Sequence, residues 1–130
     1  MIKLADLLED SQNNGSTIQV NKDDQKGIMD VDIYDPEGTK IGKIELDSYD
    51  EGKTWTISGA NIGEEYRGRG YYRQALINLV NKYPQIKVVS AFRSPEANRA
   101  WKSLVTKAGK DYKITSKKVD GEIEHYLSKN

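Results

Sequence analysis

The sequence predicts a mixed α/β fold in which a largely antiparallel central sheet is flanked by helices. Three observations lead to this fold class. Alternating segments rich in β-branched residues follow one another between residues 27 and 62, as in an antiparallel meander. Helical periodicity begins near residue 70, and helix, strand and helix then alternate as far as residue 109. Two final strands flank Asp120-Gly121, a dipeptide favoured in tight hairpin turns.

The first half of the chain is expected to form one short helix and four strands. Loosely helical spacing of apolar residues predicts the helix over residues 2–8. The strands are expected over residues 17–20, 27–34, 40–46 and 54–62. Asp35-Pro36-Glu37-Gly38 fits a type I turn with proline in its second position, and Asp50-Glu51-Gly52-Lys53 supplies the next turn.

The second half is expected to hold two helices, one strand and a hairpin. The first helix begins near Gly70 and ends before Pro84, and a strand follows over residues 86–92. Ser94-Pro95-Glu96 has the composition of a helix start, and Gly109 is a natural stop for that helix. Its expected inner face comprises Ala97, Trp101, Leu104, Val105 and Ala108. The hairpin is expected over residues 111–116 and 122–127.

Length and composition fit a single domain over residues 1–130, with a short N-terminal region (1–26) and a core (27–130). No stretch approaches the roughly 20 apolar residues that a membrane span needs. Acidic residues near the start argue against a signal peptide. The absence of cysteine excludes disulfides and thiolate chemistry and fits a cytoplasmic protein, and no residue cluster has the spacing of a metal site.

The joint between the last meander strand and the next helix carries the clearest chemical signal. It reads Glu64-Glu65-Tyr66-Arg67-Gly68-Arg69-Gly70-Tyr71-Tyr72. A glycine-rich turn that opens a helix presents unpaired N–H groups and the positive end of the helix dipole, which suits a phosphate or pyrophosphate. Gly68 and Gly70 let the backbone approach an anion closely, and Arg67 and Arg69 add charge-assisted contacts to that anion. The alternative is an ordinary turn with solvent-facing arginines.

The net charge of zero conceals a division between the two halves of the chain. Residues 1–66 contain 15 acidic and 6 basic side chains, whereas residues 67–130 contain 5 acidic and 14 basic side chains. This asymmetry suits one region to an anionic ligand and the other to a cationic one. The alternatives are that the halves attract each other or that the charges lie on solvated faces.

Two motifs, in this order, resemble those of the GNAT (acyl-CoA N-acyltransferase) superfamily. Residues 62–70 are similar to its acetyl-CoA-binding motif: residues 67–71 fit the first five places, and Tyr72 stands in the sixth, where a small residue is usual. Residues 94–109 are similar to the family's fourth-helix motif, with Asn98 in the asparagine place. The element order also agrees over residues 27–127. The resemblance therefore implies a GNAT-like fold with a splayed central strand.

The resemblance also implies a function, an N-acetyltransferase that moves an acetyl group from acetyl-CoA to a small cationic amine or a protein amine by direct attack. The implied cofactor-binding residues are Asn61, Ile62, Arg67, Gly68, Arg69, Gly70, Tyr71, Tyr72 and Asn98. The pyrophosphate would lie on the backbone of residues 67–72 and the pantetheine arm beside Asn61 and Ile62. Arg73, Arg99 and Lys102 are expected near the outer phosphate.

Two catalytic groups that are usual in the family are missing from this sequence. Val105 stands where many members keep a tyrosine that protonates the leaving thiolate, and residues 54–62 contain no carboxylate to deprotonate the amine. The candidate substitutes are Tyr112, Tyr71, Tyr72, Glu64 and Glu65, each of which has an alternative role in packing or as a solvated charge. His125, the only histidine, is expected to be a core or sheet-surface residue.

These departures favour an alternative function, a non-catalytic GNAT-fold module that binds acyl-CoA or a protein partner. Nucleic-acid binding through the basic half is disfavoured, because Trp101 and Phe92 lie in apolar patterns typical of a core. The expected partner is an amine, without membrane association, and the chain is expected to act as a monomer or homodimer.

Overall fold

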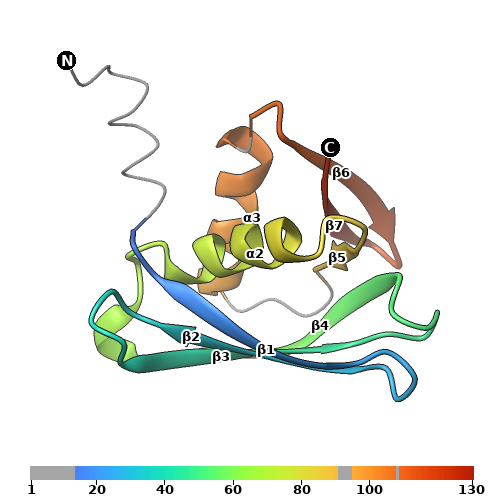
Figure 1. Cartoon of the computed structure of the whole chain (residues 1–130). Helices are drawn as coiled ribbons and strands as arrows, with labels where there is room; N and C mark the ends of the chain where they lie inside the picture. Colours follow the sequence, from blue (N-terminus) through green and yellow to red (C-terminus); the bar gives the residue numbers. More distant parts are fainter. Residues whose placement is uncertain (1–13, 91–94, 108) are drawn as a thin grey trace.

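The computed structural model describes residues 14–90, 95–107 and 109–130 (Figure 1). Seven strands form one sheet in the order β1-β2-β3-β4-β5-β7-β6. The strands are β1 (Thr17–Asp23), β2 (Ile28–Tyr34), β3 (Lys40–Asp47), β4 (Thr54–Ile62), β5 (Lys87–Val89), β6 (Tyr112–Val119) and β7 (Glu122–Lys129). The helices are the 3₁₀ turn η1 (Glu64–Tyr66), α2 (Tyr71–Lys82) and α3 (Pro95–Lys107). The helix expected over residues 2–8 lies outside the described residues.

Strands β1 to β4 form the predicted antiparallel meander. Buried apolar side chains alternate with more exposed ones along β2 and along the paired stretches of β3 and β4 on either side of their register shifts, so one face of the meander belongs to the core. The members of this face with at most 2% exposure are Met29, Val31, Ile33, Ile44, Leu46, Trp55 and Ile57. The strand expected over residues 17–20 is longer than predicted, because its ladder with β2 continues to Asp23.

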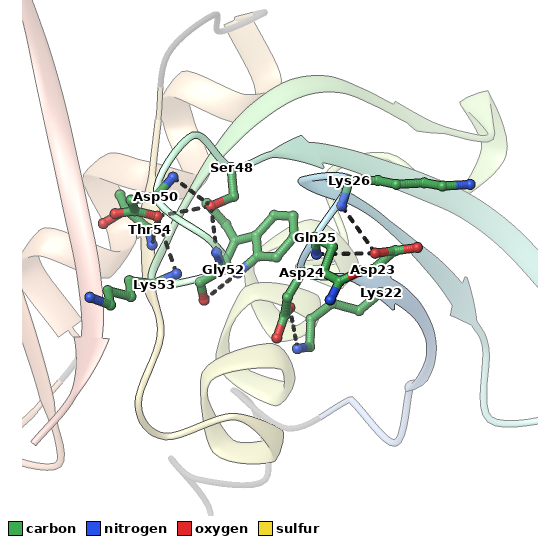
Figure 2. Close-up of polar contacts among 11 residues, drawn as sticks. Lys22, Asp23, Asp24, Gln25, Lys26, Ser48, Asp50, Gly52, Lys53 and Thr54 are labelled. Atoms are coloured by element: carbon green, nitrogen blue, oxygen red, sulfur yellow. Dashed lines mark hydrogen bonds and ion pairs between the residues drawn. The ribbon is translucent and has the colours of Figure 1, made fainter.

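Two turns meet at one end of the meander (Figure 2). Asp50 Oδ1 accepts hydrogen bonds from Ser48 Oγ (2.9 Å) and from the backbone N–H groups of Lys53 (3.1 Å) and Thr54 (2.8 Å). These bonds, led by the Thr54 N–H, lower the pKa of Asp50 to about 2. The neighbouring turn needs a glycine, because a Cβ on Gly27 would lie 2.1 Å from the Ser48 carbonyl oxygen.

Helix α2 packs against β1, β2, β5 and β7, and α3 packs against α2 and β6 (Figure 1). On α2, the helical periodicity predicted from residue 70 onward is confirmed by the burial of Ala75, Leu76, Leu79 and Val80. On α3, Ala97, Trp101 and Leu104 are buried as expected, but Val105 is 46% exposed, so its prediction as an inner-face residue is wrong. The buried stripe follows i, i+4 and i+7 and leaves Val105 about 100° further round. Ala108 lies outside the described residues.

Strand β4 is splayed away from β5, as the predicted fold class requires. The β3–β4 register shifts between Glu45↔Gly59 and Leu46↔Ile57, which leaves Ser58 as a bulge. Parallel pairing with β5 covers only Thr54 to Thr56. Within the described part of the chain, residues 57–62 therefore pair on one side only, and we call their other side the open edge of β4. The strand expected over residues 86–92 is shorter than predicted: β5 ends at Val89, and residues 91 and 92 lie outside the described residues.

Strands β6 and β7 form the predicted hairpin and extend it to Val119 and Lys129. Asp120 and Gly121 both have positive φ (50° and 84°), the conformation of a two-residue hairpin turn. No helix in the described ranges is long and apolar enough to cross a membrane.

Candidate anion-binding site at the start of helix α2

The chain passes from β4 to α2 through a turn that only glycine accommodates easily. After η1, Arg67 is extended, and Gly68 and Gly70 have φ values of 76° and 80°. Other residues adopt this left-handed conformation at a cost of about 1–2 kcal/mol. A Cβ placed on Gly68 would meet nothing within 4 Å, so the turn borders open space. The backbone that precedes α2 is therefore accessible to a ligand.

That space is a cavity of about 270 Å³, which we call the cationic cavity. Its lining residues come from the end of β4, the turn, the first turn of α2, and α3: Ile62, Tyr66, Arg67, Gly68, Gly70, Tyr71, Tyr72, Arg73, Arg99, Ala100 and Ser103. Three of these side chains are arginines, and none of the described lining residues is acidic. The positive end of α2 adds to the same field, so the cavity favours an anion.

Two of the arginines are held by hydrogen bonds to the cavity wall. Arg67 Nε donates to the Ile62 carbonyl oxygen at 2.9 Å, and Arg73 Nη1 donates to Ser103 Oγ at 2.7 Å. A guanidinium has five N–H donors, so the bond to Ser103 engages only one of those of Arg73. Sequence reasoning did not identify Ser103. Its position four residues after Arg99, on the same side of α3, is the signal that could have found it.

A second cavity of about 310 Å³, here the edge cavity, adjoins the first. It is lined by Ala60, Asn61, Ile62, Arg67, Tyr72, Pro95, Ala97 and Arg99. The Gly63 N–H donates to the Ile41 carbonyl oxygen across the β3 side, so strand alternation turns the Ile62 backbone toward the open edge of β4. The edge cavity thus combines small apolar groups with an unpaired strand edge.

Solved structures with this arrangement of elements are described as acetyltransferases. Mutant forms of the spermidine/spermine N-acetyltransferase SpeG from Vibrio cholerae match with a TM-score of 0.52 and 14% identity, over 78% of this chain and 66% of theirs. A protein from Bacteroides thetaiotaomicron assigned to the GNAT family matches with a TM-score of 0.50 and 15% identity, over 80% and 62%. A protein from Klebsiella pneumoniae assigned as an acyl-CoA N-acyltransferase matches with a TM-score of 0.51 and 17% identity, over 81% and 74%.

The chain has the GNAT fold. It spans slightly less than two thirds of the length of the first two of these proteins. No protein-family model matches its sequence, and no curated protein does. The fold is therefore established by shape, together with the splayed β4 and the glycine turn that precedes α2.

Within this GNAT fold, most of the predicted cofactor-binding residues come together. The residues that border a cavity are Asn61, Ile62, Arg67, Gly68, Gly70, Tyr71 and Tyr72. Arg69 and Asn98 border neither cavity. The Arg69 guanidinium instead lies 5.9 Å from the centre of the Tyr66 ring, and Asn98 is half-buried on α3. The exposed Lys102 also borders neither cavity, whereas Arg73 and Arg99 both line the cationic cavity.

Some of the predicted catalytic candidates line a cavity, and others lie elsewhere in the structure. Tyr71 lines the cationic cavity with its ring edge against Tyr66, at 6.0 Å between centroids, and Tyr72 lines both cavities. Tyr112 lies elsewhere, on β6, where its hydroxyl donates to Asn81 Oδ1 at 3.0 Å. Glu64 is exposed in η1 and borders neither cavity. Tyr71 and Tyr72 thus border a cavity, whereas Tyr112 and Glu64 do not.

Proposed function

We propose that this chain is an N-acetyltransferase that moves the acetyl group of acetyl-CoA to an amine. The observation that carries the proposal is that the two cavities adjoin each other, since both are lined by Ile62, Arg67, Tyr72 and Arg99. The cationic cavity, with its glycine-turn backbone, suits a pyrophosphate. The adjacent open edge of β4 suits an extended arm that contains amide groups. The similarity in fold to acetyltransferases supports the same conclusion.

The residues present fit such a ligand in chemical type. The backbone around Gly68 and Gly70 and the three arginines would hold the phosphates. The Ile62 N–H would pair with the arm, since the Ile62 carbonyl oxygen already accepts from Arg67 Nε. Bound acetyl-CoA supplies a thioester whose carbonyl carbon an amine nitrogen can attack, with cleavage of the C–S bond. The chain would hold the two reactants together, a contribution separate from proton transfer. The Tyr72 hydroxyl is the candidate for giving a proton to the departing thiolate, because Tyr72 also borders the edge cavity, whereas Tyr71 lines only the cationic cavity.

The proposed acceptor is a cationic amine, because the acidic residues are concentrated in the half of the chain before the glycine turn. Part of that charge is neutralised locally, since Asp30 pairs with Lys43 (3.7 Å) and Asp32 with Lys40 (3.1 Å). The remaining negative field is modest. It suits a small cationic amine or a lysine of a protein without distinguishing between them.

Calorimetric titration with acetyl-CoA, followed by a thiol-release assay across an amine panel, tests the proposal. The panel should include a polyamine, an aminoglycoside and a lysine-containing peptide. We expect saturable binding and thiol release that depends on at least one of the amines. Absence of acetyl-CoA binding would refute the proposal.

A second candidate function is a non-catalytic module that binds acyl-CoA. It is favoured by the absence of a carboxylate among the described residues that line either cavity, and by the position of Val105, which borders neither. Tight acetyl-CoA binding without thiol release for any amine would support this function instead.

A further inference from the structure

The two cavities meet at the side chain of Tyr72. Tyr72 is the second residue of α2 and borders both cavities, together with Ile62, Arg67 and Arg99. Of these four side chains, Tyr72 is the one with an aromatic ring. A linear ligand whose anionic part lies over the glycine turn therefore reaches the edge cavity by passing the ring of Tyr72.

Tyr72 is held in place by its contact with α3. The Trp101 indole N–H donates a hydrogen bond to the Tyr72 hydroxyl oxygen at 3.3 Å. Trp101 is itself fully buried, and its ring stacks on that of His125, at 5.9 Å between centroids and 16° between planes. The backbone N–H of His125 in turn donates to Ser90 Oγ at 2.9 Å, and Ser90 is fully buried. The phenol is thus anchored through the core to β7 and to the end of β5.

On the far side of Tyr72, the wall of the edge cavity includes three small residues beside the polar side chains of Asn61, Arg67 and Arg99. Ala60, Pro95 and Ala97 line the edge cavity there, beside the open edge of β4. An acyl group on the end of the arm would lie against these residues, because the phosphates would occupy the cationic cavity. The room available to that acyl group is then limited by the anchored phenol, which cannot turn aside without breaking its bond to Trp101.

We infer that Tyr72 determines which acyl groups are accepted, admitting acetyl and excluding long acyl chains. This inference rests on the proposed function and adds a residue that selects the acyl donor. Replacement of the phenol by a small side chain would join the two cavities into one larger space.

The experiment compares the binding of acetyl-CoA, butyryl-CoA and hexanoyl-CoA by calorimetry to the full chain and its variants. For the wild type, we expect affinity to fall about tenfold or more from acetyl-CoA to hexanoyl-CoA. For Tyr72→Ala, we expect the ratio of the two affinities to shift at least tenfold toward hexanoyl-CoA. Tyr72→Phe keeps the ring but loses the bond to Trp101, and is expected to shift the ratio less than Tyr72→Ala does.

Tyr72→Leu provides a second test if the alanine variant does not fold, because leucine is a good helix former and retains apolar contact with the core. An unchanged chain-length profile in a folded alanine or leucine variant would overturn the inference while leaving the proposed function intact. Failure of the wild type to bind any of the three thioesters would overturn both.

Discussion

Arg73 on α2 and Ser103 on α3 are joined by a 2.7 Å hydrogen bond in the wall of the cationic cavity. The bond links residues 30 positions apart and fixes one guanidinium before any ligand arrives. A pre-positioned donor loses little conformational entropy on binding, so it contributes more to affinity than a mobile one. The cavity wall is therefore partly preorganised for an anion.

Arg99→Gln is expected to weaken acetyl-CoA binding by up to about fivefold, because an exposed ion pair contributes about 0.2–1 kcal/mol. The measurement is the calorimetric Kd at low and high salt, and the difference between the two proteins should shrink as salt rises. Lys102→Gln is the matched control, because Lys102 is an exposed cation on the same helix that borders neither cavity. Equal effects of the two substitutions would mean that only the overall charge matters.

Gly68→Ala should lower the free energy of unfolding by about 1–2 kcal/mol, because alanine is strained at positive φ. It should also weaken acetyl-CoA binding roughly tenfold, since its methyl group would separate the ligand from the backbone donors. Gly38→Ala is the control: Gly38 has φ of 87° and open space around it, away from both cavities. If both variants bind acetyl-CoA as the wild type does, the turn does not hold the phosphates.

Asp50→Asn should flatten the dependence of stability on pH between about 4 and 2. The pKa of Asp50 falls from 3.8 to about 2 in the folded chain, so its charge stabilises the fold above pH 3.8. That contribution is lost as the pH falls toward 2, and the asparagine variant has none to lose. Urea unfolding at closely spaced pH values measures the slope, and parallel curves for the two proteins would contradict the expectation.

Leu104→Ala and Val105→Ala compare the two sides of α3. Leu104 is 2% exposed, so its truncation should cost about 2–5 kcal/mol in free energy of unfolding. Val105 is 46% exposed, and its truncation should change stability by no more than about 0.5 kcal/mol. Chemical denaturation of both variants checks the difference, and comparable losses would place Val105 in the core after all.

Local sequence patterns were sufficient for most of the elements. The apolar period of α2 and the turn at Asp120-Gly121 depend on residues that are close in the chain, and both predictions are confirmed. The face of α3 was harder to predict. Val105 and Leu104 are both apolar neighbours, and only the packing of α3 against α2 and β6 decides which one is buried.

The candidate site was predictable on one wall only. The spacing of glycine and arginine predicts the wall formed by residues 67–72. The opposite wall depends on how α3 packs against α2. The spacing of four residues places Ser103 on the same side of α3 as Arg99, but its contact with Arg73 depends on how α3 packs against α2. The position of Tyr112 shortly after α3 made it a candidate proton donor. In the β6–β7 hairpin, however, its hydroxyl donates a hydrogen bond to Asn81, away from both cavities.

Because the ladder between β4 and β5 is short, the packing of α2 on both parts of the sheet helps to hold them together. Three residue pairs join the four-stranded meander to β5, β7 and β6, so the hydrogen-bonded seam between the two halves is narrow there. Helix α2 packs on β1 and β2 on one side of the seam and on β5 and β7 on the other. An anion bound at the start of α2 would therefore stabilise the union of both half-sheets, and its effect would reach well beyond the loop that it touches.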